Sequence, residues 1–173
     1  MKFLEDMLEK QYGIEIAQKI IEGYLAKRKT TLRINTIKSN IEEIKQKLDV
    51  KKIEYEEVKW SKEAIIIKNE DEKAIQEMDI YTNGEIYMQS LSSMLPPIIL
   101  EPKEDTDILD MAAAPGGKTT YLAELMENKG KIKAWDIHEH RTKLVEQNAN
   151  RLGINIIETQ VKDATQYDKN LDE

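Results

Sequence analysis

The residues of this 173-residue chain that could hold a small molecule gather around one glycine-rich stretch. Ile108 and Leu109 lead into Asp110, and the chain then continues as Met-Ala-Ala-Ala-Pro-Gly-Gly-Lys-Thr. A helical pattern of apolar residues begins at Thr119. A strand, a tight turn and a helix in this order present free backbone N–H groups, and the positive end of the helix dipole, to a ligand. The stretch therefore predicts a binding site for a polar or anionic group.

Two acids follow at the ends of the next two predicted strands. Asp136 lies 19 residues after Gly117, and Asp163 comes after the third strand. In Rossmann-like folds, an acid about 20 residues past the glycines binds the ribose hydroxyls, and ligands lie at the carboxyl edge of the sheet. A carboxylate suits a ribose diol because it accepts two hydrogen bonds. The set predicts a nucleoside cofactor, with Asp163 placed to reach the base.

Two other interpretations of the glycine-rich stretch stay open. Gly117, Lys118 and Thr119 match the end of a nucleoside-triphosphate P-loop. That motif, however, needs a glycine where this chain has Ala112, and Pro115 removes one backbone donor. In the other interpretation nothing binds, because each acid caps the helix that follows it and the small residues only allow tight packing.

Composition excludes several kinds of site. The chain has no cysteine, so disulfides, thiolate metal sites and cysteine nucleophiles are excluded within it. His138 and His140 flank Glu139 without a convincing third ligand, so we expect no metal site. No apolar run is long enough to span a bilayer, and the amino terminus turns acidic too soon for a signal peptide. We therefore expect a cytoplasmic protein without a membrane segment.

The periodicity of the sequence predicts two parts. Residues 1–100 read as a small α+β domain with an antiparallel sheet. Its expected helices are two within 2–27, one opened near residue 39 by a capping box of Ser39 and Glu42, one over 71–78, and one over 89–100 that Pro96 and Pro97 should kink or break. Its expected strands are 30–36, 53–58, 64–67 and 85–88, the last after a tight turn at 83–84.

After a polar loop at 101–105, residues 101–173 form the second predicted domain. Strands over 107–110, 131–137 and 155–160 alternate with helices over 118–128 and 139–152, which is typical of a parallel, wound α/β sheet. The strand that ends at Asp110 should be central in a complete sheet of this kind. We therefore expect one of its edges to be exposed here and to promote association.

The surface charge gives little sign of nucleic-acid binding. The net charge is −7, whereas nucleic-acid-binding domains usually carry a basic excess. The most basic patch consists of Lys27, Arg28, Lys29 and Arg33. It is either a solvated helix end favoured by the helix dipole or a contact for nucleic-acid phosphates.

The motifs as a set resemble one family. The stretch from Asp110 to Thr119 resembles the signature of the Sun/Fmu (RsmB- and RsmF-like) RNA cytosine-C5 methyltransferases, which use S-adenosylmethionine. Leu-Arg-Ile-Asn at 32–35 and the stretch 84–93 are similar to that family's upstream motifs. Asp136 with Arg141, and Asp163 with Ala164, fit its next cofactor motifs. The resemblance covers nearly the whole chain.

The resemblance implies a fold and a set of site residues. The fold would be α/β, an incomplete Rossmann-like methyltransferase sheet of three strands preceded by a small α+β RNA-binding domain. Asp136 would take the ribose hydroxyls, Asp163 the adenine amino group, and Arg141 would belong to the cofactor site. The methionine part would be wrapped by Ala112, Ala113, Ala114, Pro115, Gly116, Gly117 and Lys118. The family usually has cysteine in place of Ala112, and another small residue keeps the geometry of the turn.

The resemblance also implies a mechanism that this chain cannot complete. Family members attack C6 of cytosine with a cysteine thiolate, and a second cysteine helps to release the product. Both cysteines lie on loops after later strands, beyond Glu173. We therefore expect the amino-terminal part of an RNA methyltransferase, for rRNA more than tRNA, that is inactive alone. The alternative is a non-catalytic RNA- or cofactor-binding module.

Overall fold

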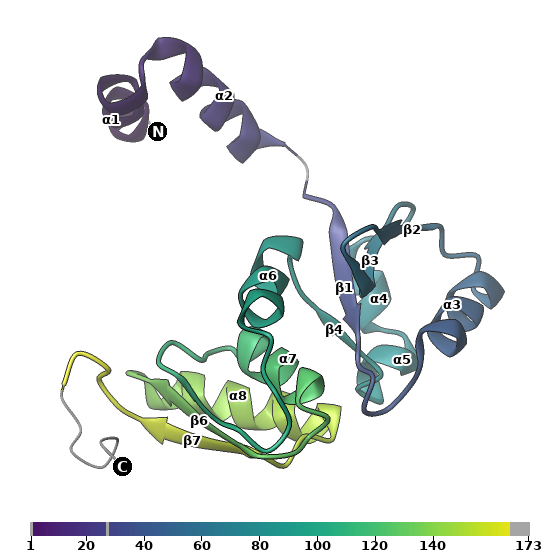
Figure 1. The fold of residues 1–173 in the computed structure, drawn as a ribbon. Helices are drawn as coiled ribbons and strands as arrows, with labels where there is room; N and C mark the ends of the chain where they lie inside the picture. Colours follow the sequence, from purple (N-terminus) through teal and green to yellow (C-terminus); the bar gives the residue numbers. More distant parts are fainter. Residues whose placement is uncertain (1, 27, 167–173) are drawn as a thin grey trace.

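The computed structural model describes residues 2–26 and 28–166, which form three successive parts (Figure 1). The first part is a hairpin of two helices, α1 (Lys2–Tyr12) and α2 (Ile14–Leu25), which stands away from the rest of the molecule. Ala17 is the one residue of the two helices recorded as buried. The other two parts each contain their own sheet, and the predicted first domain, residues 1–100, spans the hairpin as well as the first of these sheets.

The second part is an antiparallel sheet covered on one face by helices. Its strands are β1 (Thr30–Ile34), β2 (Tyr55–Val58), β3 (Ser61–Ile67) and β4 (Ile86–Met88), in the order β2-β3-β1-β4. The covering helices are α3 (Ile41–Val50), α4 (Glu72–Gln76) and α5 (Asp79–Thr82). Side chains alternate along a strand, so Leu32 and Ile34 enter this core while Arg33 points to the opposite face. The predicted α+β architecture is confirmed.

Helix α3 begins one residue later than the capping box predicts. The Asn40 side chain accepts a hydrogen bond from the Glu43 backbone N–H at 2.9 Å. The Ser39 hydroxyl instead donates to the Glu43 carboxylate at 3.3 Å. The prediction of a box formed by Ser39 and Glu42 is wrong, because the neighbouring asparagine is an equally good cap and occupies the position.

This assignment predicts different costs for two neighbouring substitutions. Asn40→Ala should lower the free energy of unfolding by about 1 kcal/mol, because one helix N–H loses its acceptor. Ser39→Ala should change it by less than about 0.5 kcal/mol, as expected for a partly exposed residue whose side chain does not cap the helix. Urea denaturation of the two variants measures both values, and equal losses would contradict the assignment of Asn40.

Helix α6 (Leu91–Leu100) runs through Pro96 and Pro97 without ending there, so of the predicted kink or break the break is wrong and the kink stays a prediction. Each proline removes the N–H that would bond to the carbonyl four residues earlier. The Gln89 side-chain amide donates to one of the two carbonyls left free, that of Ser93, at 2.9 Å. The helix also packs against its neighbours through the buried Met94. These contacts stabilise a helix that its sequence alone disfavours.

The third part is a parallel sheet with both of its helices on one face. Strands β5 (Asp107–Asp110), β6 (Lys131–Asp136) and β7 (Ile157–Val161) pair in the order β5-β6-β7. Helices α7 (Gly117–Leu125) and α8 (Glu139–Leu152) share one apolar core with this sheet. The members of that core include Leu122, Met126, Ile132, Ala149 and Leu152. The predicted wound α/β arrangement is confirmed.

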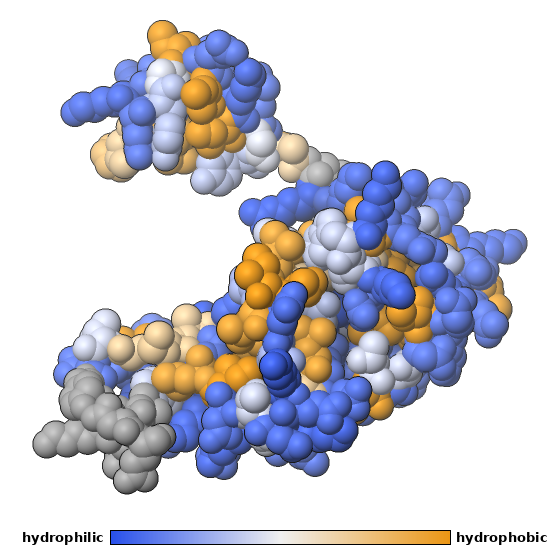
Figure 2. All heavy atoms as spheres, viewed as in Figure 1, coloured by the Kyte–Doolittle hydropathy of each residue, from blue (hydrophilic) through white to orange (hydrophobic). Residues whose placement is uncertain are grey.

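The edge predicted from the sequence is present. Within the described ranges, β5 pairs with β6 alone, so its other side forms the edge of the sheet. Apolar side chains gather over α6 in Figure 2, where Leu95, Ile99 and Leu100 are exposed, and Met111 is exposed just after β5. Association through this edge stays a prediction.

No helix in the described part of the chain combines the length and the apolar character that crossing a bilayer requires.

Candidate functional site

The carboxyl ends of β5, β6 and β7 meet at one edge of the parallel sheet. After β5, the Ala113 N–H donates to the Trp135 carbonyl near the end of β6 at 3.0 Å. After β7, the Lys162 N–H donates to the Asp136 carbonyl, also at 3.0 Å. These two bonds hold the three strand ends side by side. The glycine turn and the segments that carry Asp136 and Asp163 therefore share this edge.

The Asp110 side chain binds both ends of the glycine turn. It is 8% exposed, and one carboxylate oxygen accepts from the Ala112 N–H at 3.1 Å while the other accepts from the Thr119 hydroxyl at 2.8 Å. The Lys118 ammonium donates to the Ala112 carbonyl at 2.8 Å and lies 3.8 Å from Asp110. Sequence reasoning left Asp110 and Thr119 out of the site. The available signal was an acid that ends a strand, followed closely by a helix with threonine in its first turn.

The small residues of the turn serve packing as well as access. Ala113 and Ala114 are buried in a cluster with Ala134 of β6 and Val145 of α8. Larger side chains there would push α8 away from the sheet. Ala112, by contrast, is exposed at the start of the turn. The alanines therefore bring the turn close to the sheet and leave only part of it open to a ligand.

The two glycines have different neighbours. Gly116 has a φ of +110°, in the region that favours glycine, and a Cβ there would lie 3.4 Å from the Val145 Cα. A Cβ on Gly117 would lie 3.4 Å from both the Gln89 and the Tyr87 side chains. Gln89 and Tyr87 belong to the segment that ends the α+β sheet. Gly117 therefore allows this segment to approach the first turn of α7.

The N-terminus of α7 has no side-chain cap. Gly116 occupies the cap position and has no side chain to accept a hydrogen bond. The first N–H groups of a helix have no partner within the helix, and they carry the positive end of its dipole. A carboxylate, such as that of a bound amino-acid moiety, is a suitable acceptor for them. This arrangement fits the methionine end of S-adenosylmethionine.

Asp136 and Arg141 connect the turn to the end of β6. Asp136 is 4% exposed; one of its oxygens accepts from the His138 N–H at 3.1 Å, and Arg141 lies 3.4 Å from the other. The second terminal nitrogen of Arg141 donates to the Ala114 carbonyl at 3.1 Å. Each carboxylate oxygen has two lone pairs, so Asp136 can still accept from a ribose diol. Arg141 is engaged in holding the turn and the acid together.

Asp163 lies in a tight turn after β7. One oxygen accepts from both the N–H and the hydroxyl of Thr165, at 2.9 and 2.7 Å. These hydrogen bonds lower the pKa of the Asp163 carboxyl below its ordinary value. The group is therefore ionised at neutral pH and can accept a hydrogen bond from an amino group.

The structure also bears on the P-loop and metal interpretations. The P-loop lysine has to reach a phosphate, but Lys118 folds back on the Ala112 carbonyl. The rings of His138 and His140 lie 5.6 Å apart between centroids. Within the described residues, no three His, Asp or Glu side chains gather in a way that could hold a metal ion.

The predicted basic patch divides into residues with different surroundings. Arg28 and Lys29 are exposed, and Lys27 lies outside the described residues. Arg33 is 0% exposed and forms an ion pair with Glu124 of α7 at 2.7 Å. The assignment of Arg33 to an RNA-binding surface is therefore wrong. The alternation of β1 points its side chain at α7 and away from solvent.

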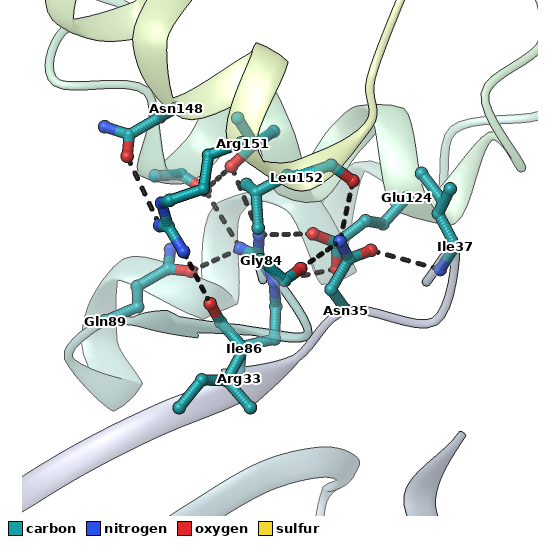
Figure 3. Close-up of polar contacts among 12 residues, drawn as sticks. Arg33, Asn35, Ile37, Gly84, Ile86, Gln89, Glu124, Asn148, Arg151 and Leu152 are labelled. Atoms are coloured by element: carbon teal, nitrogen blue, oxygen red, sulfur yellow. Dashed lines mark hydrogen bonds and ion pairs between the residues drawn. The ribbon is translucent and has the colours of Figure 1, made fainter. Parts of the chain in front are cut away.

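All five N–H donors of Arg33 have acceptors. Two bind the Glu124 carboxylate as a fork, at 2.9 and 2.7 Å. The others donate to Gln89, to the Gly117 carbonyl at 3.1 Å and to the Thr120 hydroxyl at 3.1 Å. Burial raises the pKa of the Glu124 carboxyl, while the attraction of Arg33 opposes this shift. We call this set of contacts the Arg33 joint; it connects β1 to α7, and Figure 3 draws part of it.

A second joint connects the α+β sheet to the end of α8 (Figure 3). The Asn35 amide donates to the Gly84 and Leu152 carbonyls, at 2.7 and 2.8 Å. Lys38 donates to the Arg151 carbonyl at 2.7 Å, and Arg151 donates in turn to the carbonyl of Tyr81. The last carbonyls of a helix lack partners within it. Here residues of the other domain supply those partners, and we call these contacts the Asn35 joint.

Two family descriptions match this chain. A 16S rRNA methyltransferase RsmB/F domain matches residues 97–173. An RsmF/B-like ferredoxin-like domain matches residues 2–72. The two matches fall on the parallel sheet and on the helical hairpin with most of the antiparallel sheet.

Similar proteins agree with these matches. The probable ribosomal RNA small subunit methyltransferase B of Bacillus subtilis is 39% identical over 154 residues, which is 88% of this chain and 34% of the relative. The tRNA (cytosine(49)-C(5))-methyltransferase of Pyrococcus abyssi is 44% identical over 138 residues, 79% of this chain and 44% of the relative. A solved methyltransferase homolog from Pyrococcus horikoshii aligns with a TM-score of 0.80 at 35% identity, over 88% of this chain and 50% of that one.

This chain thus spans half or less of the length of these proteins. The family matches cover residues 2–72 and 97–173, so both sheets of the chain fall largely within them. The chain belongs to the RsmB/F family of RNA cytosine-C5 methyltransferases, whose methyl donor is S-adenosylmethionine.

Proposed function

We propose that this chain binds S-adenosylmethionine at the carboxyl edge of its parallel sheet and is part of an RNA cytosine-C5 methyltransferase. The observation that carries the proposal is the position of two carboxylates, Asp136 and Asp163, at the ends of β6 and β7, on the same edge of the sheet as the uncapped N-terminus of α7. A ribose diol, an adenine amino group and an amino-acid carboxylate require these three features. The names of the relatives from Bacillus subtilis and Pyrococcus abyssi support RNA as the substrate.

Each part of the edge has a proposed role. The residues that hold the methionine moiety are those of the turn, Ala112, Ala113, Ala114, Pro115, Gly116, Gly117 and Lys118. Asp136 accepts from the ribose hydroxyls, and Asp163 accepts from the adenine amino group. Arg141 orients Asp136 and the turn by binding both. The cofactor, when bound, supplies an electrophilic methyl group on its sulfonium sulfur.

We propose that the thiolate nucleophile lies outside these residues, because the 173-residue sequence has no cysteine. A thiolate suits attack on C6 of cytosine because it is nucleophilic near neutral pH and can leave again. The chain alone is then expected to bind cofactor without methylating RNA. A non-catalytic RNA- or cofactor-binding module is the alternative function.

The proposed partner is RNA, and we propose rRNA ahead of tRNA. The proposed location is the cytoplasm. The relative from Bacillus subtilis supports rRNA, and the archaeal relative supports tRNA. Arg28 and Lys29 are exposed and are the proposed phosphate contacts. The face of the antiparallel sheet that carries Ala64 and Ile66 packs against Met94 of α6 and residues of α7. We therefore expect RNA to bind at the rim of this domain.

A methyl-transfer assay tests this proposal. The chain, extended to the full length of its relatives, should move the labelled methyl group of S-adenosylmethionine to C5 of cytosine in rRNA. Asp136→Ala in that protein should abolish transfer at low cofactor concentration. Replacement of the downstream cysteine should abolish it at any cofactor concentration. Binding of RNA without transfer would favour the alternative module, and cytosine methylation by residues 1–173 alone would contradict the proposed mechanism.

A further inference from the structure

We propose that Arg33, from the α+β domain, is a positioning residue for the turn that holds the cofactor. The inference rests on the proposed function and extends it, because it places one determinant of cofactor affinity in the other domain. Arg33 lies on β1, 84 residues before Gly117 in the sequence, yet donates to the Gly117 carbonyl at 3.1 Å. It does so from a fully buried position with no exposure to solvent.

The Arg33 guanidinium is held rigidly in this place. Glu124 binds it as a fork through two hydrogen bonds. The Tyr121 and Tyr87 rings lie 4.4 and 5.3 Å from its central carbon, at distances suited to cation–π contact. Gln89 accepts from the same nitrogen that donates to Gly117. A planar group fixed by this many partners defines the direction of its remaining hydrogen bond.

Fixing the Gly117 carbonyl also fixes an N–H group at the ligand site. A peptide group is planar, so the carbonyl of Gly117 and the N–H of Lys118 point in opposite directions along one rigid unit. The Lys118 N–H is in the first turn of α7 and has no acceptor within the helix. Arg33 therefore sets the orientation of a donor that the cofactor carboxylate would use. Its bond to the Thr120 hydroxyl, at 3.1 Å, holds the same turn a second time.

The Asn35 joint provides a matched control for this role. Asn35 is also buried, lies on the segment after β1 and joins the same two domains. Its contact is the carbonyl of Leu152 at the end of α8, and its bonds do not include the glycine turn. Loss of Asn35 should weaken the contact between the two domains and leave the orientation of the Lys118 N–H unchanged. The two joints therefore separate positioning from general stability.

The test compares three variants of the 173-residue chain. The double variant Arg33→Met with Glu124→Leu removes both charges together, so no unpaired charge stays buried. Arg33→Lys keeps the charge, but its ammonium cannot bind both Glu124 oxygens and also reach the Gly117 carbonyl. If the double variant does not fold, Arg33→Lys is the variant that is compared with the parent chain. Asn35→Ala is the control. For each, hydrogen exchange of the Ala113 and Thr120 amides is compared with that of Ile132, and calorimetry gives the Kd for S-adenosylhomocysteine.

The proposal predicts a selective effect at the turn. In the Arg33 variants, the Ala113 and Thr120 amides should exchange about tenfold faster relative to Ile132, and the Kd should rise about tenfold, as for a coupling of moderate size. Asn35→Ala should leave the relative exchange rates and the Kd within about twofold of the values of the parent chain.

Two results would overturn the inference: unchanged exchange at the turn in the Arg33 variants, or an equal change in Asn35→Ala. If the parent chain fails to bind S-adenosylhomocysteine while exchange at the turn still rises selectively, Arg33 positions the turn and the proposed function fails. If the parent binds and its Kd does not change in the Arg33 variants, the inference fails and the proposed function stands.

Discussion

Arg33→Met should lower the free energy of unfolding by about 3–5 kcal/mol, the cost of removing one partner of a buried ion pair. Glu124 has a side-chain exposure of 1%, so water cannot replace the guanidinium. The Gly117 carbonyl and the Gln89 and Thr120 side chains would lose a donor at the same time. Urea denaturation of the parent chain and the variant measures the difference.

An exposed ion pair provides the control for this prediction. Lys129 lies 2.8 Å from Glu104, and their side chains are 49% and 46% exposed. Lys129→Met should change the free energy of unfolding by less than about 1 kcal/mol, because water and ions screen exposed pairs. Adding Glu124→Leu to Arg33→Met should recover most of the loss, since the unpaired buried charge is then gone. A loss below about 1 kcal/mol for Arg33→Met would show that the Arg33 joint does not form.

Gly84→Ala should destabilise the chain by about 3 kcal/mol or more, in the range of severe single substitutions. A Cβ on Gly84 would lie 1.9 Å from the Arg151 carbonyl oxygen, so the backbone of α8 would have to move. Such a shift would break the Asn35 bonds to Gly84 and Leu152. The positive φ of +74° adds a cost of about 1–2 kcal/mol for any residue with a Cβ.

Gly153→Ala is the matched control, because Gly153 has nearly the same φ, +76°, and directly follows Leu152 of the Asn35 joint. Its Cβ would meet the Lys38 side chain at 2.8 Å, and this exposed side chain can move aside by giving up its hydrogen bonds to the Asn83 and Arg151 carbonyls to water. We expect a loss of about 1–2 kcal/mol there, mainly from the backbone conformation. Thermal or urea unfolding gives both values. If Gly84→Ala costs no more than Gly153→Ala, α8 does not dock on Gly84 as described.

Local sequence patterns predicted the elements of the parallel sheet well. The bounds of β5 (Asp107–Asp110) and α8 (Glu139–Leu152) agree with the prediction residue for residue. Both elements depend on signals within a few residues, namely an apolar run that ends at an acid and an apolar period that ends at a C-cap glycine. The glycine turn and the two acids at the strand ends also follow from such local signals.

Contacts that the local sequence does not show, together with one competition between neighbouring residues, explain the predictions that were wrong. Arg33 belongs to a basic patch in the sequence, but its partner Glu124 is 91 residues away, and only the fold brings them together. Pro96 and Pro97 stay within α6 partly because the Gln89 side-chain amide donates a hydrogen bond to the Ser93 carbonyl. Two adjacent residues compete for the cap of α3, and their sequence order alone does not decide between Ser39 and Asn40.

Titration calorimetry of S-adenosylhomocysteine into the 173-residue chain and its Asp136→Ala variant tests the central claim most directly. Loss of the carboxylate removes the acceptor of the ribose diol, so the Kd should rise at least about tenfold, as for the loss of a charge-assisted hydrogen bond. Lys133→Ala, on the same strand β6, should leave the Kd unchanged. Equal Kd values for the parent and Asp136→Ala, or no binding by the parent, would contradict a cofactor site at this edge of the sheet.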